Sequence, residues 1–256
     1  MIRVGKQNKP ILFISDLHLC RTRPQITRLF LDFLSSLPRE TDALYILGDL
    51  FEYWAGDDDI DDALNTTIAE HFLNLAKTGT QIFLMHGNRD FLISDSFSQR
   101  AGITILKDPS LIVSHGKRIL LSHGDSLCTD DVAYQAFRQQ VRSPSWQAAF
   151  LSQSLASRKA LIEKLREQSE IEKSNKSESI MDVNSEAVSE MIREFGHPDV
   201  LIHGHTHRPG QHRIQKDGHM TERWVLGDWY EQGSCIRLDE NGLKALPIRA
   251  DRQSLP

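Results

Sequence analysis

The feature that most restricts the fold of this chain is a series of short apolar runs, each of which ends in small and polar residues. These runs occupy residues 11–15, 43–47, 81–85 and 199–203. Short runs rich in Ile, Leu and Phe that stop at turn-forming residues are typical of buried strands. Amphipathic stretches with helical spacing lie among them, at 24–37, 60–77 and 91–100. Alternating strands and helices predict an α/β fold with a largely parallel sheet that helices cover.

Two further regions predict a second, more antiparallel sheet. Apolar runs flank His115-Gly116-Lys117 in the manner of a hairpin, and another strand-rich stretch occupies 211–247. That stretch carries turn signals at Asp217-Gly218 and Asn241-Gly242. The length of 256 residues suits one α/β domain, so we expect a single domain over residues 1–256.

Residues 132–171 are helical in composition, and we expect them to form an insertion within this domain. The segment carries six basic and three acidic residues, a charge of +3 in a chain whose net charge is −5. One interpretation is a solvated face on helices that only pack against the rest of the chain. The other is a lid that meets an anionic ligand. The aromatic residues of the segment leave the same choice, between core packing and contact with a ligand.

Charge and composition exclude several classes of protein. A net charge of −5 argues against a protein that covers nucleic acid with Lys and Arg over its whole surface. Three widely spaced cysteines without a Cys-x-x-Cys pair favour reduced thiols and a cytosolic location. The first ten residues lack the apolar stretch of a signal peptide, and every apolar run is far shorter than the ~20 residues that span a bilayer. We therefore expect a soluble protein whose membrane contact can only be peripheral.

Five loop segments, each directly after an apolar strand, carry residue types that bind metals. They are Asp16-Leu17-His18, Gly48-Asp49, Gly87-Asn88-Arg89-Asp90, His123-Gly124-Asp125 and Gly204-His205-Thr206-His207. Ligands of such sheets gather beyond the carboxyl ends of the strands, so the repeated position predicts that the five loops meet at one site. A lone His or Asp after a strand is more often a turn or capping residue, but that explanation does not account for the whole set.

The donor types indicate a site for two divalent ions. Oxygen and imidazole donors without thiolate suit Mn²⁺, Fe²⁺ or Zn²⁺, and the two oxygens of one Asp can bridge two ions. The Asp-x-His and His-x-His pairs each place two donors on one side of an extended segment. The neighbouring glycines let the backbone turn sharply and approach the site closely.

With these five blocks in this order, the chain resembles the calcineurin-like metallophosphoesterase superfamily. The resemblance implies an α/β fold with a two-sheet β-sandwich core flanked by helices and with a helical lid insertion. It also implies two Mn²⁺ ions per chain, with Fe or Zn not excluded. One ion would be surrounded by Asp16, His18, Asp49 and His207. The other would be surrounded by Asp49, Asn88, His123 and His205, with Asp49 as the bridge.

Several residues near these motifs receive a structural interpretation. We expect Asp125 to orient a metal-binding imidazole, since carboxylates outside the ligand set commonly hold ligating histidines. We expect Asp90 to be structural. The same holds for five histidines that fall outside the pattern, namely His86, His115, His203, His212 and His219.

Arg89 narrows the class of substrate. Many members of the superfamily carry at this position a histidine that helps the leaving group depart. An arginine supplies charge and not a proton, and it grips phosphate oxygens in a fork. A phosphate leaving group is stable as an anion and needs charge stabilisation more than a proton, so Arg89 favours a pyrophosphate substrate. The alternative is a structural arginine paired with Asp90 or Asp49.

Longer stretches narrow the resemblance to one family, the UDP-2,3-diacylglucosamine pyrophosphatases of lipid A biosynthesis. The most specific are Gly48-Asp49-Leu50-Phe51-Glu52-Tyr53-Trp54 and Met181-Asp182-Val183-Asn184. The resemblance implies hydrolysis of UDP-2,3-diacylglucosamine to UMP and 2,3-diacylglucosamine 1-phosphate (lipid X), with Mn²⁺, by a peripheral protein at the cytoplasmic face of the inner membrane. It implies no nucleic-acid partner, and we expect a monomer.

The same resemblance implies which residues act on the substrate. Catalytic roles fall on Asn88, Arg89 and His205. Substrate contacts fall on Asn88, Arg89, Asp131, Ser169, Lys173, Lys176 and His205. Two alternatives stay open at this point: a two-metal phosphodiesterase or nucleotide pyrophosphatase with a soluble nucleotide substrate, and a scaffold that has lost its metals.

Overall fold

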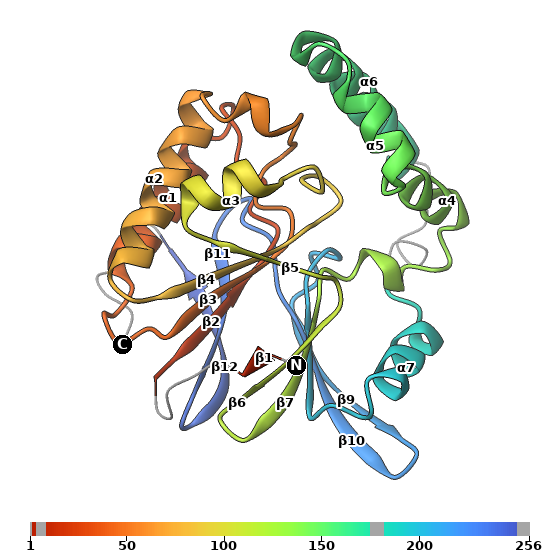
Figure 1. Ribbon diagram of the computed structural model, residues 1–256. Coiled ribbons are helices and arrows are strands. Elements are labelled where there is room, and N and C mark those ends of the chain that lie inside the picture. Colours follow the sequence, from red (N-terminus) through yellow and green to blue (C-terminus); the bar gives the residue numbers. More distant parts are fainter. Residues whose placement is uncertain (1, 4–8, 175–181, 250–256) are drawn as a thin grey trace.

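The computed structural model describes residues 2–3, 9–174 and 182–249, and it consists of two facing sheets with helices on their outer sides (Figure 1). The first sheet contains, in spatial order, β12 (Gly242–Ile248), β11 (Gly233–Asp239), β2 (Ile11–Ile14), β3 (Ala43–Leu47), β4 (Gln81–Met85) and β5 (Thr104–Leu106). The last four strands are parallel, as the alternation of strands and helices predicts.

The second sheet is mixed. It contains, in spatial order, β1 (Ile2–Arg3), β6 (Ser110–Ser114), β7 (Lys117–Ser122), β8 (Val200–His203), β10 (His219–Val225) and β9 (Gly210–Lys216). The strands β6 and β7 form the predicted antiparallel hairpin, and β9 and β10 form another. The fold class predicted from the sequence is confirmed.

Two assignments of strands to sheets were wrong. The run at 199–203 was grouped with the parallel sheet, but β8 lies in the second sheet, parallel to β7. The hairpin at Asn241-Gly242 was placed in the second sheet, but β11 and β12 extend the first sheet, antiparallel to β2. The reason is that β8 is buried on both faces, as β2 and β3 are, so their apolar runs look alike although they belong to different sheets.

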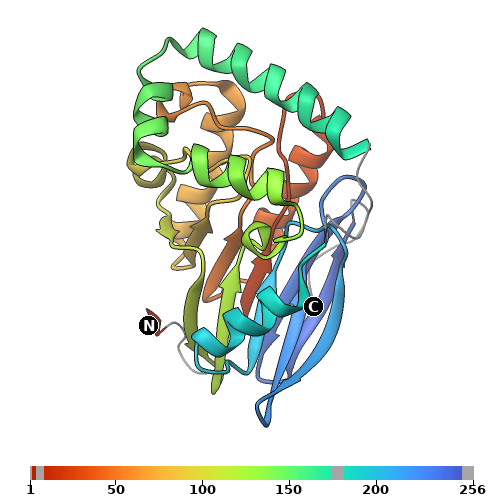
Figure 2. The same cartoon turned by 90° about the vertical axis from the view of Figure 1, so that its right-hand side faces the viewer.

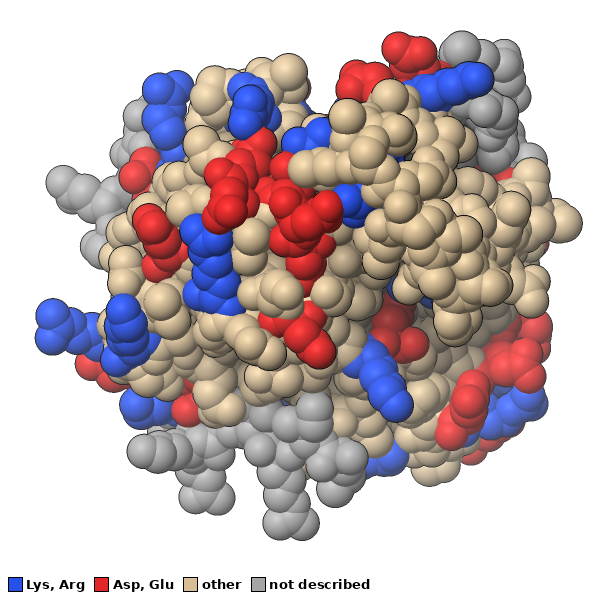
Figure 3. Space-filling model, turned by 45° about the horizontal axis from the view of Figure 1, so that its top comes forward, with Lys and Arg blue, Asp and Glu red and all other residues tan. Residues whose placement is uncertain are grey.

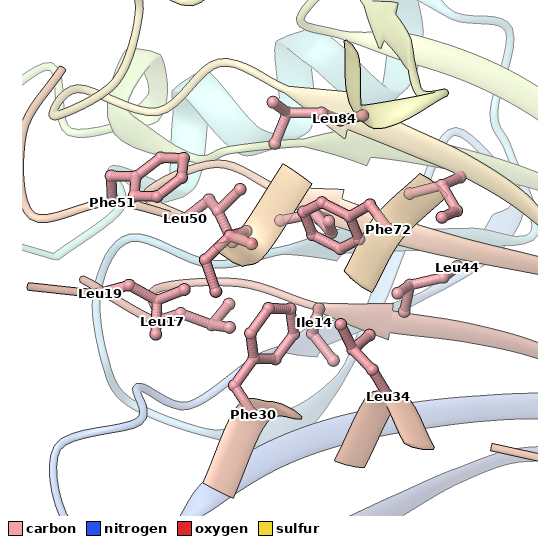
Figure 4. Packing of buried hydrophobic residues seen from close by; sticks show 14 of the residues in the cluster. Ile14, Leu17, Leu19, Phe30, Leu34, Leu44, Leu50, Phe51, Phe72 and Leu84 are labelled. Carbon is pink, nitrogen blue, oxygen red and sulfur yellow. The ribbon is translucent and has the colours of Figure 1, made fainter. Parts of the chain in front are cut away.

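The cores on the two faces of the first sheet follow from the alternation of side chains along its strands. In β2, Leu12 and Ile14 face the helices, whereas Ile11 and Phe13 pack between the two sheets. Three helices cover the outer face, namely α1 (Pro24–Ser36), α2 (Ala63–Lys77) and α3 (Asp95–Ala101). Figure 4 shows Phe30 of α1 beside Ile14. Complete burial of such a side chain stabilises the fold by about 1.5–3 kcal/mol.

Local signals set the limits of these helices. Pro24 occupies the first turn of α1, where its missing N–H breaks no helical hydrogen bond, and Pro38 follows the end of the helix. The carboxylate of Asp62 caps α2 by accepting from the backbone N–H of Leu64. Gly102 ends α3 in the left-handed conformation that suits glycine.

One further helix covers the second sheet. In α7 (Ser185–Glu194), Val188 and Ile192 pack against Leu120 of β7 and Leu201 of β8. The two sheets, α1 to α3 and α7 together are called the body below.

The segment that was predicted to be a helical insertion contains α4 (Val132–Val141), α5 (Pro144–Leu151) and α6 (Leu155–Ser174). Asp131 caps α4 by accepting from the backbone of Tyr134, and Ser143 caps α5 in the same way. Figures 1 and 2 show these helices beyond the carboxyl ends of the parallel strands, with α6 crossing above the body. Within residues 9–174 and 182–249, no helix is both long enough and apolar enough to cross a membrane.

Candidate metal centre

The candidate site lies where the carboxyl ends of strands from both sheets meet. Asp16 and His18 follow β2, Asp49 follows β3, and Asn88 follows β4, and these three strands are parallel neighbours. The remaining donors come from the second sheet: His123 follows β7, and His205 and His207 follow β8. The structure therefore brings together all seven residues that the sequence selected as metal ligands.

One group of donors contains Asp16, His18 and His207, whose ligand atoms all lie within 4.8 Å of one another. Nε2 of His18 lies 3.4 Å from Nε2 of His207 and 3.6 Å from Oδ2 of Asp49. Nε2 of His207 lies 3.5 Å from Oδ1 of Asp16. Imidazole nitrogens and carboxylate oxygens at these separations can surround one cation.

A second group of donors lies on the other side of Asp49. Oδ1 of Asn88 lies 3.0 Å from Nε2 of His123 and 2.9 Å from Nδ1 of His205. Oδ1 of Asp49 lies 3.9 Å from Nε2 of His123. The two carboxylate oxygens of Asp49 thus approach different imidazoles, Oδ2 that of His18 and Oδ1 that of His123, as a residue between two ions requires.

The backbone at this site is strained. Five of the seven residues have left-handed φ angles, which are uncommon outside glycine: Asp16 (56°), His18 (49°), Asp49 (53°), His205 (69°) and His207 (56°). Each such conformation destabilises the fold by about 1–3 kcal/mol, and it persists where the surrounding structure enforces it, commonly at functional sites. These left-handed conformations turn the donor side chains of separate loops toward one place.

Two glycines make the close approach of the loops possible. A Cβ at Gly87 would collide with the carboxylate and backbone of Asp49, and a Cβ at Gly204 would collide with Ser15 and the carboxylate of Asp16. Any larger residue at either position would therefore push a carboxylate out of the site.

The outward nitrogens of three imidazoles face oxygen atoms of the protein, at distances from 2.8 to 3.6 Å. Nδ1 of His123 donates to the carbonyl of Leu47 over 2.8 Å, which leaves Nε2 free to face the site. Nδ1 of His207 lies 3.3 Å from a carboxylate oxygen of Asp228, and Nδ1 of His18 lies 3.6 Å from one of Glu52. Acceptors of this kind fix the orientation and raise the basicity of ligating histidines.

Sequence reasoning missed Glu52 and Asp228, although a signal existed for each. Glu52 lies in the specific block 48–54, three residues after Asp49. Asp228 follows Gly227 shortly after β10, which repeats the arrangement of a strand, a glycine and an aspartate that singled out Asp49.

Asp125 contacts a candidate ligand indirectly, through Tyr134, which stacks on His205, and the expectation for Asp90 is correct. Oδ2 of Asp125 accepts from Nε of Arg138 over 2.7 Å and from the hydroxyl of Tyr134 over 2.9 Å, whereas the carbonyl of Leu47 accepts the hydrogen bond from Nδ1 of His123. The alternation of strand side chains could not show that α4 would supply these donors. Asp90 is structural, since it accepts from the backbone of its own loop and of the loop after β3.

Burial raises the pKa of the central carboxyl group. Asp49 is almost completely buried, and burial together with the charges of Asp90 and Asp16 raises its pKa to about 7. Three carboxylates within one buried region repel one another, and bound cations would remove that repulsion.

Carboxylates also raise the pKa values of two imidazoles at the site. Burial lowers the pKa of an imidazole, but Asp49 and other carboxylates outweigh burial and raise the pKa of His123 to about 9. Asp16 and Asp228 likewise raise the pKa of His207 to about 10. These two rings therefore favour their protonated forms, whereas burial lowers the pKa of His205 to about 3 and that of His18 well below its usual range.

The structure describes the side chains of two candidate substrate-binding residues that are not candidate ligands, Arg89 and Asp131. Arg89 is half-buried beside it, and its backbone amide donates to Oδ1 of Asp49 over 2.8 Å. Asp131 is the N-cap of α4. The side chains of Ser169, Lys173 and Lys176 lie outside the described part of the chain.

The basic residues of the insertion mostly pair with carboxylates of the body. Five of the six basic residues in 132–171 form such ion pairs: Arg138 and Arg142 with Asp125, Arg158 with Asp58, Lys159 with Asp59, and Arg166 with Glu52. Figure 3 shows acidic side chains gathered on the body beside the lobe that the insertion forms. Docking on an acidic surface therefore accounts for most of the positive charge of the segment, and neither sequence-based interpretation of that charge included it.

The aromatic residues of the insertion divide into two groups. Trp146 and Phe150 stack at 4.9 Å, and Trp146 also contacts Phe91 of the body, so these rings serve packing. In contrast, the aromatic residue Phe137 is 42% exposed, and the aliphatic residue Leu151 is 43% exposed.

This chain is similar to a known protein family and to several individual proteins. The calcineurin-like phosphoesterase family matches residues 9–209. Proteins named UDP-2,3-diacylglucosamine hydrolase are similar to this chain: that of Aromatoleum aromaticum is 54% identical, covering 90% of this chain and 94% of the relative. That of Cellvibrio japonicus is 53% identical, covering 91% and 96%. Among solved structures, an archaeal phosphodiesterase aligns at 14% identity and a TM-score of 0.48, covering 93% of this chain and 99% of its own.

Proposed function

Because this chain belongs to the calcineurin-like phosphoesterases and, within them, to the family of UDP-2,3-diacylglucosamine hydrolases, we propose that it hydrolyses the pyrophosphate bond of UDP-2,3-diacylglucosamine. The products would be UMP and 2,3-diacylglucosamine 1-phosphate (lipid X), in lipid A biosynthesis. The observation that carries the proposal is the sequence identity of more than half over nearly the full length of both proteins, in a chain whose seven candidate ligands converge.

The proposed cofactor is a pair of Mn²⁺ ions, and the residues fit it. Oδ1 of Asp16 is buried and makes no hydrogen bond within the described residues, with Nε2 of His207 facing it at 3.5 Å, which suits an oxygen and a nitrogen that would share a cation. Asp16, His18, Asp49 and His207 would hold one ion, and Asp49, Asn88, His123 and His205 the other. When bound, such ions activate water and neutralise charge on phosphate oxygens. Fe or Zn would fit the same donors.

Three side chains of the protein would orient and stabilise the diphosphate. Arg89 adds positive charge beside Asp49, in a fork that matches phosphate oxygens. Oδ1 of Asn88 lies beside the facing nitrogens of His123 and His205, so it would hold the same ion as these two rings, and His205 would also steady charge that develops on the leaving phosphate. We assign substrate binding to Arg89, Asn88 and His205, and to Asp131, Ser169, Lys173 and Lys176 at the edge of the insertion.

The insertion, residues 132–171, would act as a lid that binds the acyl chains. Its exposed apolar side chains support this role, since Val132 is 74% exposed and Phe137 and Leu151 are nearly half exposed. We propose that the same surface touches the cytoplasmic face of the inner membrane peripherally, and that the enzyme acts as a cytoplasmic monomer without a nucleic-acid partner.

A product assay tests the proposal. The purified protein, with Mn²⁺ in detergent, should release UMP from UDP-2,3-diacylglucosamine. In water labelled with ¹⁸O, the label should appear in UMP, because we expect attack at the phosphorus next to the uridine. UDP-glucose, cyclic nucleotides and dinucleoside polyphosphates serve as controls. Faster turnover of one of these soluble nucleotides than of the lipid would contradict the proposal.

A further inference from the structure

Glu52 connects a proposed metal ligand with the insertion. The residue is only 8% exposed and directly follows the isolated bridge that Phe51 forms with Leu19. Its Oε2 lies 3.6 Å from Nδ1 of His18, and its Oε1 accepts from Arg166 of α6 over 3.0 Å. One carboxylate therefore contacts both the ring that faces the metal centre and a helix of the insertion.

Arg23 fixes the position of this carboxylate from the body side. One nitrogen of its guanidinium donates to Oε2 of Glu52 over 2.6 Å and to the backbone carbonyl of His18 over 2.8 Å. The same guanidinium lies 4.5 Å from the ring of Tyr230, which in turn stacks on His18 at 5.5 Å. The His18 ring is thus enclosed by groups that themselves have partners.

The two oxygens of Glu52 consequently have separate anchors, Arg23 on Oε2 and Arg166 on Oε1. Loss of either anchor would let the carboxylate turn away from His18. A separation of 3.6 Å is slightly longer than a hydrogen bond, so a small rotation of the ring is enough to close it.

We propose that Glu52 is a positioning residue, which holds the His18 ring in its ligating orientation and makes that orientation depend on the docking of α6 through Arg166. The inference rests on the proposed two-metal function and adds a route by which the insertion affects the metal centre. Groups that hold a ligating histidine typically change metal affinity by about 10- to 100-fold when they are removed.

The chain offers a closely matched control. Lys159, also on α6, pairs with Asp59 of the body over 2.7 Å. The exposed fractions of the two basic side chains are almost equal, 34% for Lys159 and 33% for Arg166, and their carboxylate partners are similarly buried. The ion pair between Lys159 and Asp59 also docks α6 on the body, but neither residue contacts His18. Lys159→Ala therefore removes a docking contact without affecting the contact with His18.

The experiment measures Mn²⁺ binding by calorimetric titration in the wild type, Glu52→Gln, Arg166→Ala and Lys159→Ala. In Glu52→Gln, one of the two ions should bind about tenfold more weakly while the other binds normally. Arg166→Ala should weaken the same ion about threefold, and Lys159→Ala should leave both affinities unchanged. The double variant Glu52→Gln with Arg166→Ala should bind like Glu52→Gln alone, because Arg166 acts through Glu52.

Distinct results would overturn the inference. Unchanged Mn²⁺ binding in Glu52→Gln would rule out the positioning role. Equal effects of Arg166→Ala and Lys159→Ala would show that Arg166 acts through the docking of α6 in general and not through Glu52. If Glu52→Gln does not fold, the comparison of those two α6 variants decides alone. A wild-type protein that binds fewer than two ions would instead contradict the proposed function.

Discussion

The ring of Tyr134 stacks on that of His205, with centroids 5.9 Å apart and planes inclined by 26°. The first residue lies in α4, and the second is a candidate ligand after β8. The hydroxyl of Tyr134 also donates to buried Asp125. The insertion therefore contacts the second group of donors directly, while Glu52 connects it to the first.

This contact predicts different results for two substitutions of Tyr134. Tyr134→Phe keeps the stacking but removes a hydrogen bond to a buried carboxylate, which should lower the free energy of unfolding by about 1.5–3 kcal/mol. Tyr134→Ala also removes the support of the His205 ring, so kcat should fall about tenfold further. Urea unfolding and steady-state kinetics measure the two effects. Equal kcat values for both variants would show that stacking does not matter.

Removal of Asp49 should abolish metal binding and turnover together. Asp49→Ala takes away a carboxylate that approaches His18 in one donor group and His123 in the other. Elemental analysis should find fewer than two ions per chain, and UMP release should fall by at least a thousandfold, about 4 kcal/mol of transition-state stabilisation. Asp61→Ala, at a carboxylate that is 88% exposed and pairs with Arg100, is the control and should keep both properties.

Metal binding should release protons and strengthen as the pH rises. His123 and His207 have pKa values raised to about 9 and about 10, so both rings carry a proton at neutral pH before a metal binds. Ligating imidazoles must be neutral, so each has to lose its proton. Calorimetry in buffers of different ionisation enthalpy should show proton release at pH 7 and less of it near pH 10. Heats that do not depend on the buffer would contradict this prediction.

Asp57 should be important for stability without contributing to chemistry. Its carboxylate accepts from the indole of Trp54, from the backbone and hydroxyl of Ser94 and from the backbone of Phe97. Asp57→Ala leaves these donors unsatisfied and should lower the free energy of unfolding by about 2–4 kcal/mol. Asp61→Ala breaks only an exposed ion pair with Arg100, and it should change stability by less than about 1 kcal/mol. Similar losses in both variants would disprove the structural role.

The sequence was most informative where a local pattern determines the result. Apolar runs marked the central strands, and the position of polar residues directly after them predicted that seven candidate ligands would converge. The resemblance to UDP-2,3-diacylglucosamine pyrophosphatases, read from blocks such as 48–54, was confirmed by relatives that share more than half of the sequence.

The remaining features depend on contacts between distant parts of the chain. The sheet to which β8 belongs depends on its pairing with β7, more than 75 residues earlier. Arg138, a partner of Asp125, comes from α4, and Arg166, one of the partners of Glu52, comes from α6. A pattern along the chain shows that a carboxylate is present, but it does not show which guanidinium will dock on it.

The candidate ligands come from both sheets, Asp16, His18, Asp49 and Asn88 from one and His123, His205 and His207 from the other. An ion held by this set would join the two halves of the sandwich in the way that a crosslink does. Separating the halves would then require the ion to dissociate, so its binding energy would add to the stability of the whole fold. Removal of the ions by a chelator would accordingly lower the stability of the whole fold as well as the catalytic activity.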